Sequence, residues 1–259
     1  MACSLNGYYV QNPQAHAKWM PPGEREGQYL AALRWMATAR TGADKVVFCE
    51  NSEACLDRLN SLTTLFTKKG RTLEIYKVPM PETQTFLGKG WGEGLIIRWA
   101  LENVPSLVRS DGFIKITSRY QILNLKRIMT IISRGLKVNP RLKFVCQAFL
   151  NKDRPVVYGH FFWSKREFFV SHLLDAYKEV DDKKGFYFEH AIARRLMDLG
   201  DHSEIGVLQM PLIIQGTWGS NGKPIMGIRE MLKESLRQTL LPIPPLRQFN
   251  GNLPMRSIG

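Results

Sequence analysis

The first half of the sequence alternates short apolar runs with stretches of helical periodicity. Strands are expected at residues 6–10, 45–49, 73–78 and 112–117, the last three reading KVVFC, LEIYKV and GFIKIT. Helices are expected at residues 24–38 and 93–103, and another after residues 51–52, which can cap it. Near-continuous apolar strands are typical of a parallel sheet covered by helices on both faces. The alternation therefore predicts an α/β, Rossmann-type fold whose first half is a nucleotide-binding unit.

The second half is less regular. Strands are expected at residues 143–150, 156–162 and 207–214, and helices at residues 165–177, 189–199 and 228–240. Residues 216–224, GTWGSNGKP, read as a loop, and the proline-rich end reads as an extended arm. The predicted organisation is a nucleotide-binding half at residues 1–125, a second half of the same domain at 126–240, and a basic tail at 241–259.

The net charge of +13 indicates an anionic partner. Nucleic acid, an anionic membrane face and a phosphorylated small molecule all fit this charge, but no aromatic-flanked nucleic-acid module is present. No run approaches the ~18 to 20 apolar residues of a membrane span, and the N-terminus lacks the features of a secretory signal. A cytoplasmic location is expected.

A glycine-rich segment precedes the helix expected at residues 93–103. It reads GKGWGEG over residues 88–94. Glycines let a backbone approach a ligand closely, and a helix N-terminus offers free N–H groups to an anion. The spacing is neither that of a P-loop nor that of a dinucleotide fingerprint. Ligand contact and a flexible, glycine-rich turn both remain open.

The strand that follows ends in polar residues. Strand alternation places Lys115, Thr117 and Arg119 on one face, while Ile114 and Ile116 point to the other. In an open α/β sheet the ligand crevice lies at the carboxyl ends of the strands. Two cations and a hydroxyl there suit a diphosphate or a carboxylate. The alternative is a lysine and an arginine that pair with acids on a covering helix.

Five acidic or histidine residues, at three places in the sequence, could carry further chemistry. Glu189 and His190 open the helix expected at residues 189–199, where Glu189 could be a general base or could simply benefit from the helix dipole. His160 is interpreted as a strand histidine with its own partners. Asp181 and Asp182 resemble a metal-binding pair, but their polar surroundings favour a solvated loop.

Residues 87–124 resemble the central block of small GT-A-like glycosyltransferases of bacterial capsule and O-antigen clusters. Their pattern is approximately G-K-G-x-G-E, a helix, then K-I-T-G-R-Y with an Asn shortly after. This sequence matches it with two groups of residues: Gly88, Lys89, Gly90, Gly92 and Glu93; and Lys115, Ile116, Thr117, Arg119, Tyr120 and Asn124, with Ser118 where Gly is usual. Residues 49–52, CENS, are similar to the strand-end segment of the same proteins.

The resemblance implies a transferase that moves a sugar from a nucleotide-sugar to a saccharide or lipid-linked saccharide acceptor in surface polysaccharide synthesis. The first half would bind the donor and the second half the acceptor. The implied donor-binding residues are Asn51, Lys89, Gly90, Gly92, Glu93, Lys115, Thr117 and Arg119. Glu189 and His190 would be catalytic, and Trp218 and Asn221 would contact the acceptor. The basic end of the chain could touch the anionic inner face of a membrane.

GT-A enzymes normally hold a divalent metal on an Asp-x-Asp at the end of the fourth strand, where this sequence has Lys115-Ile116-Thr117-Ser118-Arg119. A Mn²⁺ or Mg²⁺ requirement is therefore in question, since cations can neutralise the donor diphosphate instead. Two other functions remain open: a basic nucleic-acid-binding protein, supported by charge alone, and a non-catalytic member of the transferase fold.

Overall fold

The computed structural model describes residues 2–5, 22–39, 43–51, 56–79, 88–149, 155–217, 224–227, 229–230, 232–233, 236 and 246–248. Its strands are β1 (Ala2–Leu5), β2 (Lys45–Glu50), β3 (Thr72–Lys77), β4 (Gly112–Thr117), β5 (Gln121–Ile122), β6 (Phe144–Phe149), β7 (Val156–Lys165), β8 (Ile205–Leu208), β9 (Ile214–Gln215) and β10 (Leu246–Gln248). Its α-helices are α1 (Pro22–Thr38), α2 (Asp57–Asn60), α3 (Thr63–Lys68), α4 (Lys89–Asn103), α5 (Pro105–Val108), α6 (Leu125–Val138), α7 (Arg166–Phe168) and α8 (Phe188–Met197). Shorter turns of π- or 3₁₀-helix are η2 (Phe169–Leu173), η3 (Ala176–Glu179), η4 (Asp182–Lys184) and η5 (His202–Glu204).

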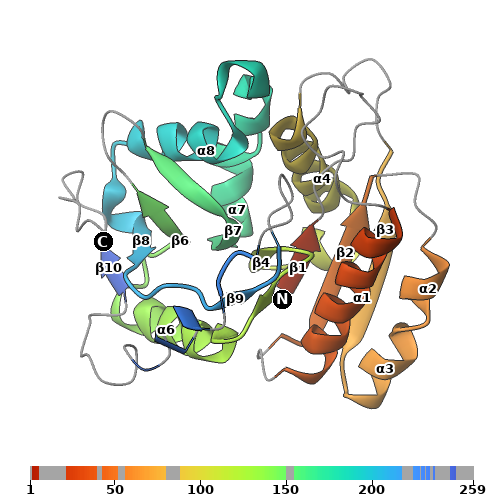
Figure 1. Cartoon of the computed structure of the whole chain (residues 1–259). Coiled ribbons are helices and arrows are strands. Elements are labelled where there is room, and N and C mark those ends of the chain that lie inside the picture. Colours follow the sequence, from red (N-terminus) through yellow and green to blue (C-terminus); the bar gives the residue numbers. More distant parts are fainter. Residues whose placement is uncertain are drawn as a thin grey trace.

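The main sheet has eight strands in the order β10-β8-β6-β7-β4-β1-β2-β3 (Figure 1). Strands β3, β2, β1 and β4 are parallel neighbours, and β6 and β8 run the same way. Strand β7 is antiparallel to both β4 and β6, and β10 is antiparallel to β8. The 3-2-1-4 order is that of a mononucleotide-binding half. The predicted Rossmann-type, mostly parallel α/β fold is confirmed.

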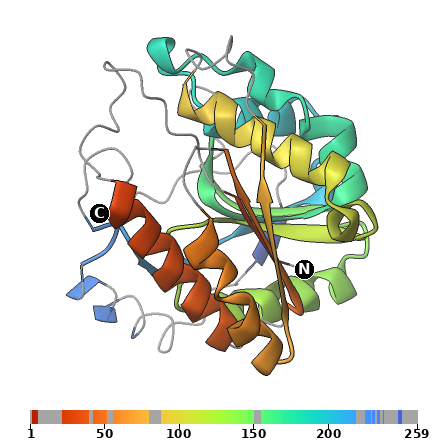
Figure 2. The ribbon, with the colours of Figure 1, turned by 90° about the vertical axis from the view of Figure 1, so that its right-hand side faces the viewer.

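Helices cover both faces of this sheet (Figure 2). Side chains that alternate along the strands divide between two cores: Val47, Phe113 and Phe162 pack with α4 and α8. Their neighbours Phe48 and Ile114 pack on the other face with α1, α3 and α6. Burial on both faces explains why these strands read as continuous apolar runs rather than as alternating ones.

Most of the predicted elements are present. The structure confirms β2, β3, β4, β6, β7, α1 and α8 within a few residues of their predicted bounds. The strand predicted at residues 6–10 lies outside the described residues, and β1 lies just before it. The helix predicted at 228–240 and the arm predicted at 241–259 also lie largely outside them, although β10 adds part of the arm to the sheet.

Three element predictions were wrong, and a fourth lies partly outside the described residues. The first described helix after β2 begins at Asp57, and a turn at residues 61–62 separates α2 from α3, while residues 52–55, which follow the predicted cap, lie outside the described residues. Helix α4 starts at Lys89 instead of Glu93. The helix predicted at 165–177 is divided into α7, η2 and η3, and the strand predicted at 207–214 into β8 and β9. Helix α6 was not anticipated, although its apolar residues recur at helical spacing.

Within the described residues, no helix combines the length and the apolar character needed to cross a membrane.

Candidate active site

The candidate site lies at the carboxyl ends of the parallel strands, beside the point where the strand order reverses. The chain leaves β1 through α1 toward β2 on one side, and returns through α4 to β4 on the other. These two helices cover opposite faces of the sheet. In open α/β sheets, ligands bind at the carboxyl ends of the strands where the strand order reverses in this way. The polar residues that end β4 lie at this edge.

Lys115 is the buried basic residue of the site. It is fully buried in β4, and its Nζ contacts Glu93 Oε1 of α4 and the carbonyl oxygen of Gly159 in β7. Nζ also donates to Thr117 Oγ1 at 3.2 Å, and Thr117 Oγ1 donates to the same Gly159 carbonyl at 3.2 Å. An ammonium group has three N–H donors. All three are therefore used by protein groups, so this geometry does not leave Lys115 open to a diphosphate.

Glu189 of α8 lies next to this cluster. An ideal Cβ built at Gly159 would be 2.7 Å from Glu189 Oε1, so the carboxyl group occupies the space that a side chain at Gly159 would fill. Burial and the nearby Glu93 carboxylate raise the pKa of Glu189 to about 7, although Lys115 opposes the rise. Glu189 keeps some exposure to solvent, and the Glu93 side chain is 18% exposed. The site therefore contains a partly buried carboxyl group whose pKa lies near neutral pH.

Tyr120 and His160 form an aromatic wall that the sequence did not predict. Their rings meet edge to face at a centroid distance of 5.3 Å. Burial raises the pKa of Tyr120 to about 12, and burial together with Lys115 lowers the pKa of His160 to about 4. Both side chains are therefore neutral at pH 7. Gly159 is a sequence signal for the approach of Glu189 instead, because a glycine inside a strand often marks a close contact.

The glycine-rich segment has a different environment from the one predicted. Gly88 has a φ of 106°, and the backbone N–H of Lys89 donates to Asp182 Oδ2 at 2.7 Å. A carboxylate of the chain itself thus lies at the N-terminus of α4, where an external anion was expected. Gly90 and Gly94 face Phe188 and Tyr177 at distances that leave no room for a Cβ. These glycines permit close helix packing.

Asp182 stabilises the start of α4, so its removal is expected to weaken the fold. Asp182→Ala leaves the first N–H groups of a helix without their carboxylate, which costs about 1 to 2 kcal/mol of unfolding free energy. Asp182→Asn keeps an acceptor oxygen and is the matched control, with a smaller expected loss. Urea denaturation measures both variants, and equal losses would contradict the capping role.

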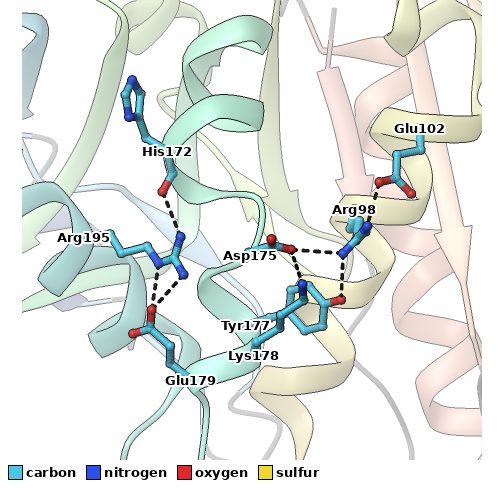
Figure 3. A network of polar contacts seen from close by, with 8 residues as sticks. All are labelled: Arg98, Glu102, His172, Asp175, Tyr177, Lys178, Glu179 and Arg195. Atoms are coloured by element: carbon cyan, nitrogen blue, oxygen red, sulfur yellow. Dashed lines mark hydrogen bonds and ion pairs between the residues drawn. The ribbon is translucent and has the colours of Figure 1, made fainter.

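Ion pairs connect α4 and α8 to residues 175–179, which lie between these two helices in the sequence (Figure 3). Arg98 of α4 donates to Asp175 Oδ1 at 3.0 Å and to Glu102 Oε1 at 2.9 Å. Arg195 of α8 donates to Glu179 Oε1 at 2.8 Å, and η3 carries Glu179. The helices that carry Glu93 and Glu189 are therefore both linked by ion pairs to the short segment between residues 175 and 179.

The remaining predicted residues lie at different distances from this cluster. Asn51 follows β2 at the same sheet edge, 7% exposed, and within the described residues neither Oδ1 nor Nδ2 has a hydrogen-bond partner. Arg119 lies in the turn after β4, beside Tyr120. His190 Nδ1 accepts from the backbone N–H of Tyr187 at 3.1 Å, which engages that nitrogen in the helix start. Gly92 is buried in the first turn of α4, and Trp218 and Asn221 lie outside the described residues.

The residues present at the end of β4 do not fit a divalent metal. Within the part of the chain that the structure describes, no group of three or more His, Cys, Asp or Glu side chains is placed to hold one. The two nearby carboxylates, Glu93 and Glu189, flank the ammonium of Lys115. Because Glu93 is already paired with that ammonium, its carboxylate is not available to hold a divalent metal.

No protein-family model matches the sequence, and no curated protein matches it either. Among solved structures, the chain is similar to apo mouse xyloside xylosyltransferase 1, with a TM-score of 0.45 and 12% identity over 80% of this chain and 85% of that one. It is similar to UDP-glucose pyrophosphorylase complexed with UDP-glucose, with a TM-score of 0.40 and 10% identity over 92% and 98%. A cytidylyltransferase from Leptospira borgpetersenii has a TM-score of 0.37 and 11% identity to this chain. The match covers 66% of this chain and 61% of the cytidylyltransferase, which is less than two thirds of its length. Likenesses at this level concern the general α/β arrangement and leave the ligand and the reaction of this chain open.

Proposed function

We propose that the protein is a glycosyltransferase that moves a sugar from a nucleotide-sugar to a hydroxyl group of a saccharide or lipid-linked saccharide. The observation that carries this proposal is the Glu189 carboxyl group, whose pKa is about 7, beside the Lys115–Glu93 pair at the carboxyl end of β4. A general base works best when its pKa lies near the working pH. The position next to the strand-order reversal is the one at which open α/β sheets bind ligands.

In the proposed reaction, Glu189 accepts the proton of the acceptor hydroxyl as its oxygen attacks the anomeric carbon. The bond from that carbon to the donor phosphate breaks, and the nucleoside diphosphate leaves with the electron pair. Arg119 and Lys89 would stabilise the charge on the leaving diphosphate. Neutral His160 and Tyr120 would line the site without competing for the proton.

Asn51 supports a donor pocket at the same edge. A buried amide without hydrogen bonds costs about 1 to 3 kcal/mol, and a polar ligand that pairs with it removes that cost. Among the described residues, Asn51 has this unsatisfied character. We therefore propose that Asn51 contacts the donor, as the strand-end motif CENS implies.

The finer assignments are proposed from the sequence. We propose a role in surface polysaccharide synthesis at the inner face of a membrane, with no nucleic-acid partner. Trp218 and Asn221 are proposed to contact the acceptor, and His190 to support Glu189 from the next position of α8. The diphosphate would be neutralised by side chains, so that Mn²⁺ or Mg²⁺ is not required.

A thermal-shift screen tests the donor assignment. UDP, GDP, CMP and their sugar conjugates are added to the wild type with Mn²⁺ or with EDTA. One nucleotide family is expected to raise Tm to the same extent in both conditions, because ligand binding to the folded state stabilises it. Arg119→Ala is expected to reduce that shift, as for a lost charge-assisted hydrogen bond. If no nucleotide shifts the wild type, the transferase proposal fails.

A further inference from the structure

Lys115 is unusual among the residues that the structure describes, because it is the one buried basic side chain there. Removing an ammonium group from water costs several kcal/mol unless a partner compensates for it. The strand could place an aliphatic residue at this position, since Phe113 on the same face belongs to an apolar core. The presence of a charged side chain at this buried position therefore calls for a functional explanation.

The partners of Lys115 fix its ammonium from three elements. Glu93 on α4 supplies a carboxylate, Thr117 on β4 a hydroxyl, and Gly159 on β7 a carbonyl. Only Glu93 among these carries a formal charge. The Lys115–Glu93 pair is therefore neutral as a unit. It lies beside Glu189, because Gly159, whose carbonyl oxygen contacts Lys115 Nζ, also packs against Glu189 Oε1.

We propose that Lys115 is a positioning residue, which balances the charge of Glu189 from within the protein and so sets the pH range in which Glu189 acts as a base. This inference rests on the proposed function, and it identifies Lys115 as the source of positive charge next to Glu189. Lys115 would act through Glu189 without touching the donor.

The charged and titratable groups around Glu189 come from several elements. They are Glu93 on α4, Lys115 on β4, Tyr120 after β4, His160 on β7, Asp182 on η4 and the adjacent His190 on α8. Tyr120 and His160 stay neutral around pH 7, and Asp182 is a weaker influence on Glu189 than Glu93 or Lys115. The effect of neighbouring charges on the pKa of Glu189 therefore comes mainly from Glu93, which raises it, and Lys115, which lowers it.

A double-mutant cycle tests this balance. Lys115→Met leaves Glu189 beside the Glu93 carboxylate, so its apparent pKa should rise by at least one unit. Glu93→Gln leaves it beside the ammonium, so the pKa should fall. The double variant removes both charges and should return the pKa toward the wild-type value. Carboxyl ¹³C NMR of glutamate-labelled protein measures each pKa, and the acidic limb of the pH–rate profile should move in parallel.

Lys143→Met is the matched control. Lys143 pairs with Glu204 just before β6, at the amino ends of the parallel strands and so at the opposite end of the sheet from Glu189. It should leave Glu189 unchanged. An equal pKa of Glu189 in all variants would overturn the inference. A higher pKa of Glu189 in Glu93→Gln than in the wild type would overturn it too, and this variant can be measured even where Lys115→Met does not fold. The NMR titration needs no substrate, so failure of the nucleotide screen and failure of this inference are distinguishable.

Discussion

Glu189→Gln is expected to reduce sugar transfer by about 10²- to 10⁴-fold, the contribution of a well-placed general base. The donor-induced thermal shift should persist, since glutamine keeps the size and the polarity of the side chain. Loss of transfer with retained binding would identify Glu189 as a catalytic group. An unchanged transfer rate would contradict that role.

The same variant should be more stable than the wild type at alkaline pH. The folded pKa of Glu189 is raised from 4.5 to about 7, mainly because burial disfavours the ionised form. Stability that the protonated group contributes is fully present below pH ~4.5 and is lost as the pH rises through 7. Since one pKa unit corresponds to about 1.4 kcal/mol, Gln should stabilise the protein at pH 8 by at most about 3 kcal/mol.

Glu179→Gln provides a control of opposite sign. Although burial alone would raise the pKa of Glu179, hydrogen bonds and ion pairs with Arg194 and Arg195 lower it overall. Its carboxylate therefore contributes stability above its unfolded pKa, and that contribution is lost as the pH falls. Urea denaturation at pH 5 and pH 8 should show that Glu179→Gln destabilises the fold at pH 8 while Glu189→Gln stabilises it. Destabilisation by both variants would contradict the electrostatic account.

Gly94→Ala should have the second large effect, on stability. A Cβ at Gly94 would be 2.0 Å from Tyr177 Cβ and 3.0 Å from Phe188 Cε2. Tyr177 belongs to η3 and packs edge to face on Trp91 of α4, so α4 and η3 would have to separate. Overpacking of this kind costs about 1 to 3 kcal/mol or more, even after the better helix propensity of alanine is counted.

Gly27→Ala is the control for helix propensity. Gly27 is exposed in α1, and nothing lies within 4 Å of a Cβ built there. This change should stabilise the protein by about 0.5 to 1 kcal/mol. Urea midpoints followed by tryptophan fluorescence compare the two variants. If Gly94→Ala matched the wild type, the close contact between α4 and η3 would be refuted.

The parallel half of the fold could be predicted because its strands are buried on both faces. The interior residues of β2 and β4 are all buried, and most of them are apolar. The alternation along β4 also held, since Ile114 and Ile116 join one core while Lys115 turns to α4. The second half was harder, because short elements such as η2, η3 and β9 are determined by tertiary packing more than by local pattern.

The sequence singled out Glu93, Lys115 and Glu189, but it could not assign their partners. The structure shows the second of the two interpretations of Lys115, an ion pair with an acid on a covering helix, in its contact with Glu93. Asp182 was interpreted as part of a solvated loop, yet it lies at the start of α4, 93 residues away in sequence. Contacts at such separation depend on how the helices pack, and no local periodicity records them.

The apparent pKa of Glu189 in the wild-type protein tests the central claim most directly. Carboxyl ¹³C NMR, with Glu189→Gln to assign the signal, is performed with and without the nucleotide selected by the thermal-shift screen. The account predicts one glutamate that titrates near pH 7 and whose signal moves when the nucleotide binds. A protein in which every glutamate titrates between about pH 4 and 5, or in which the bound nucleotide leaves this signal unmoved, would contradict it.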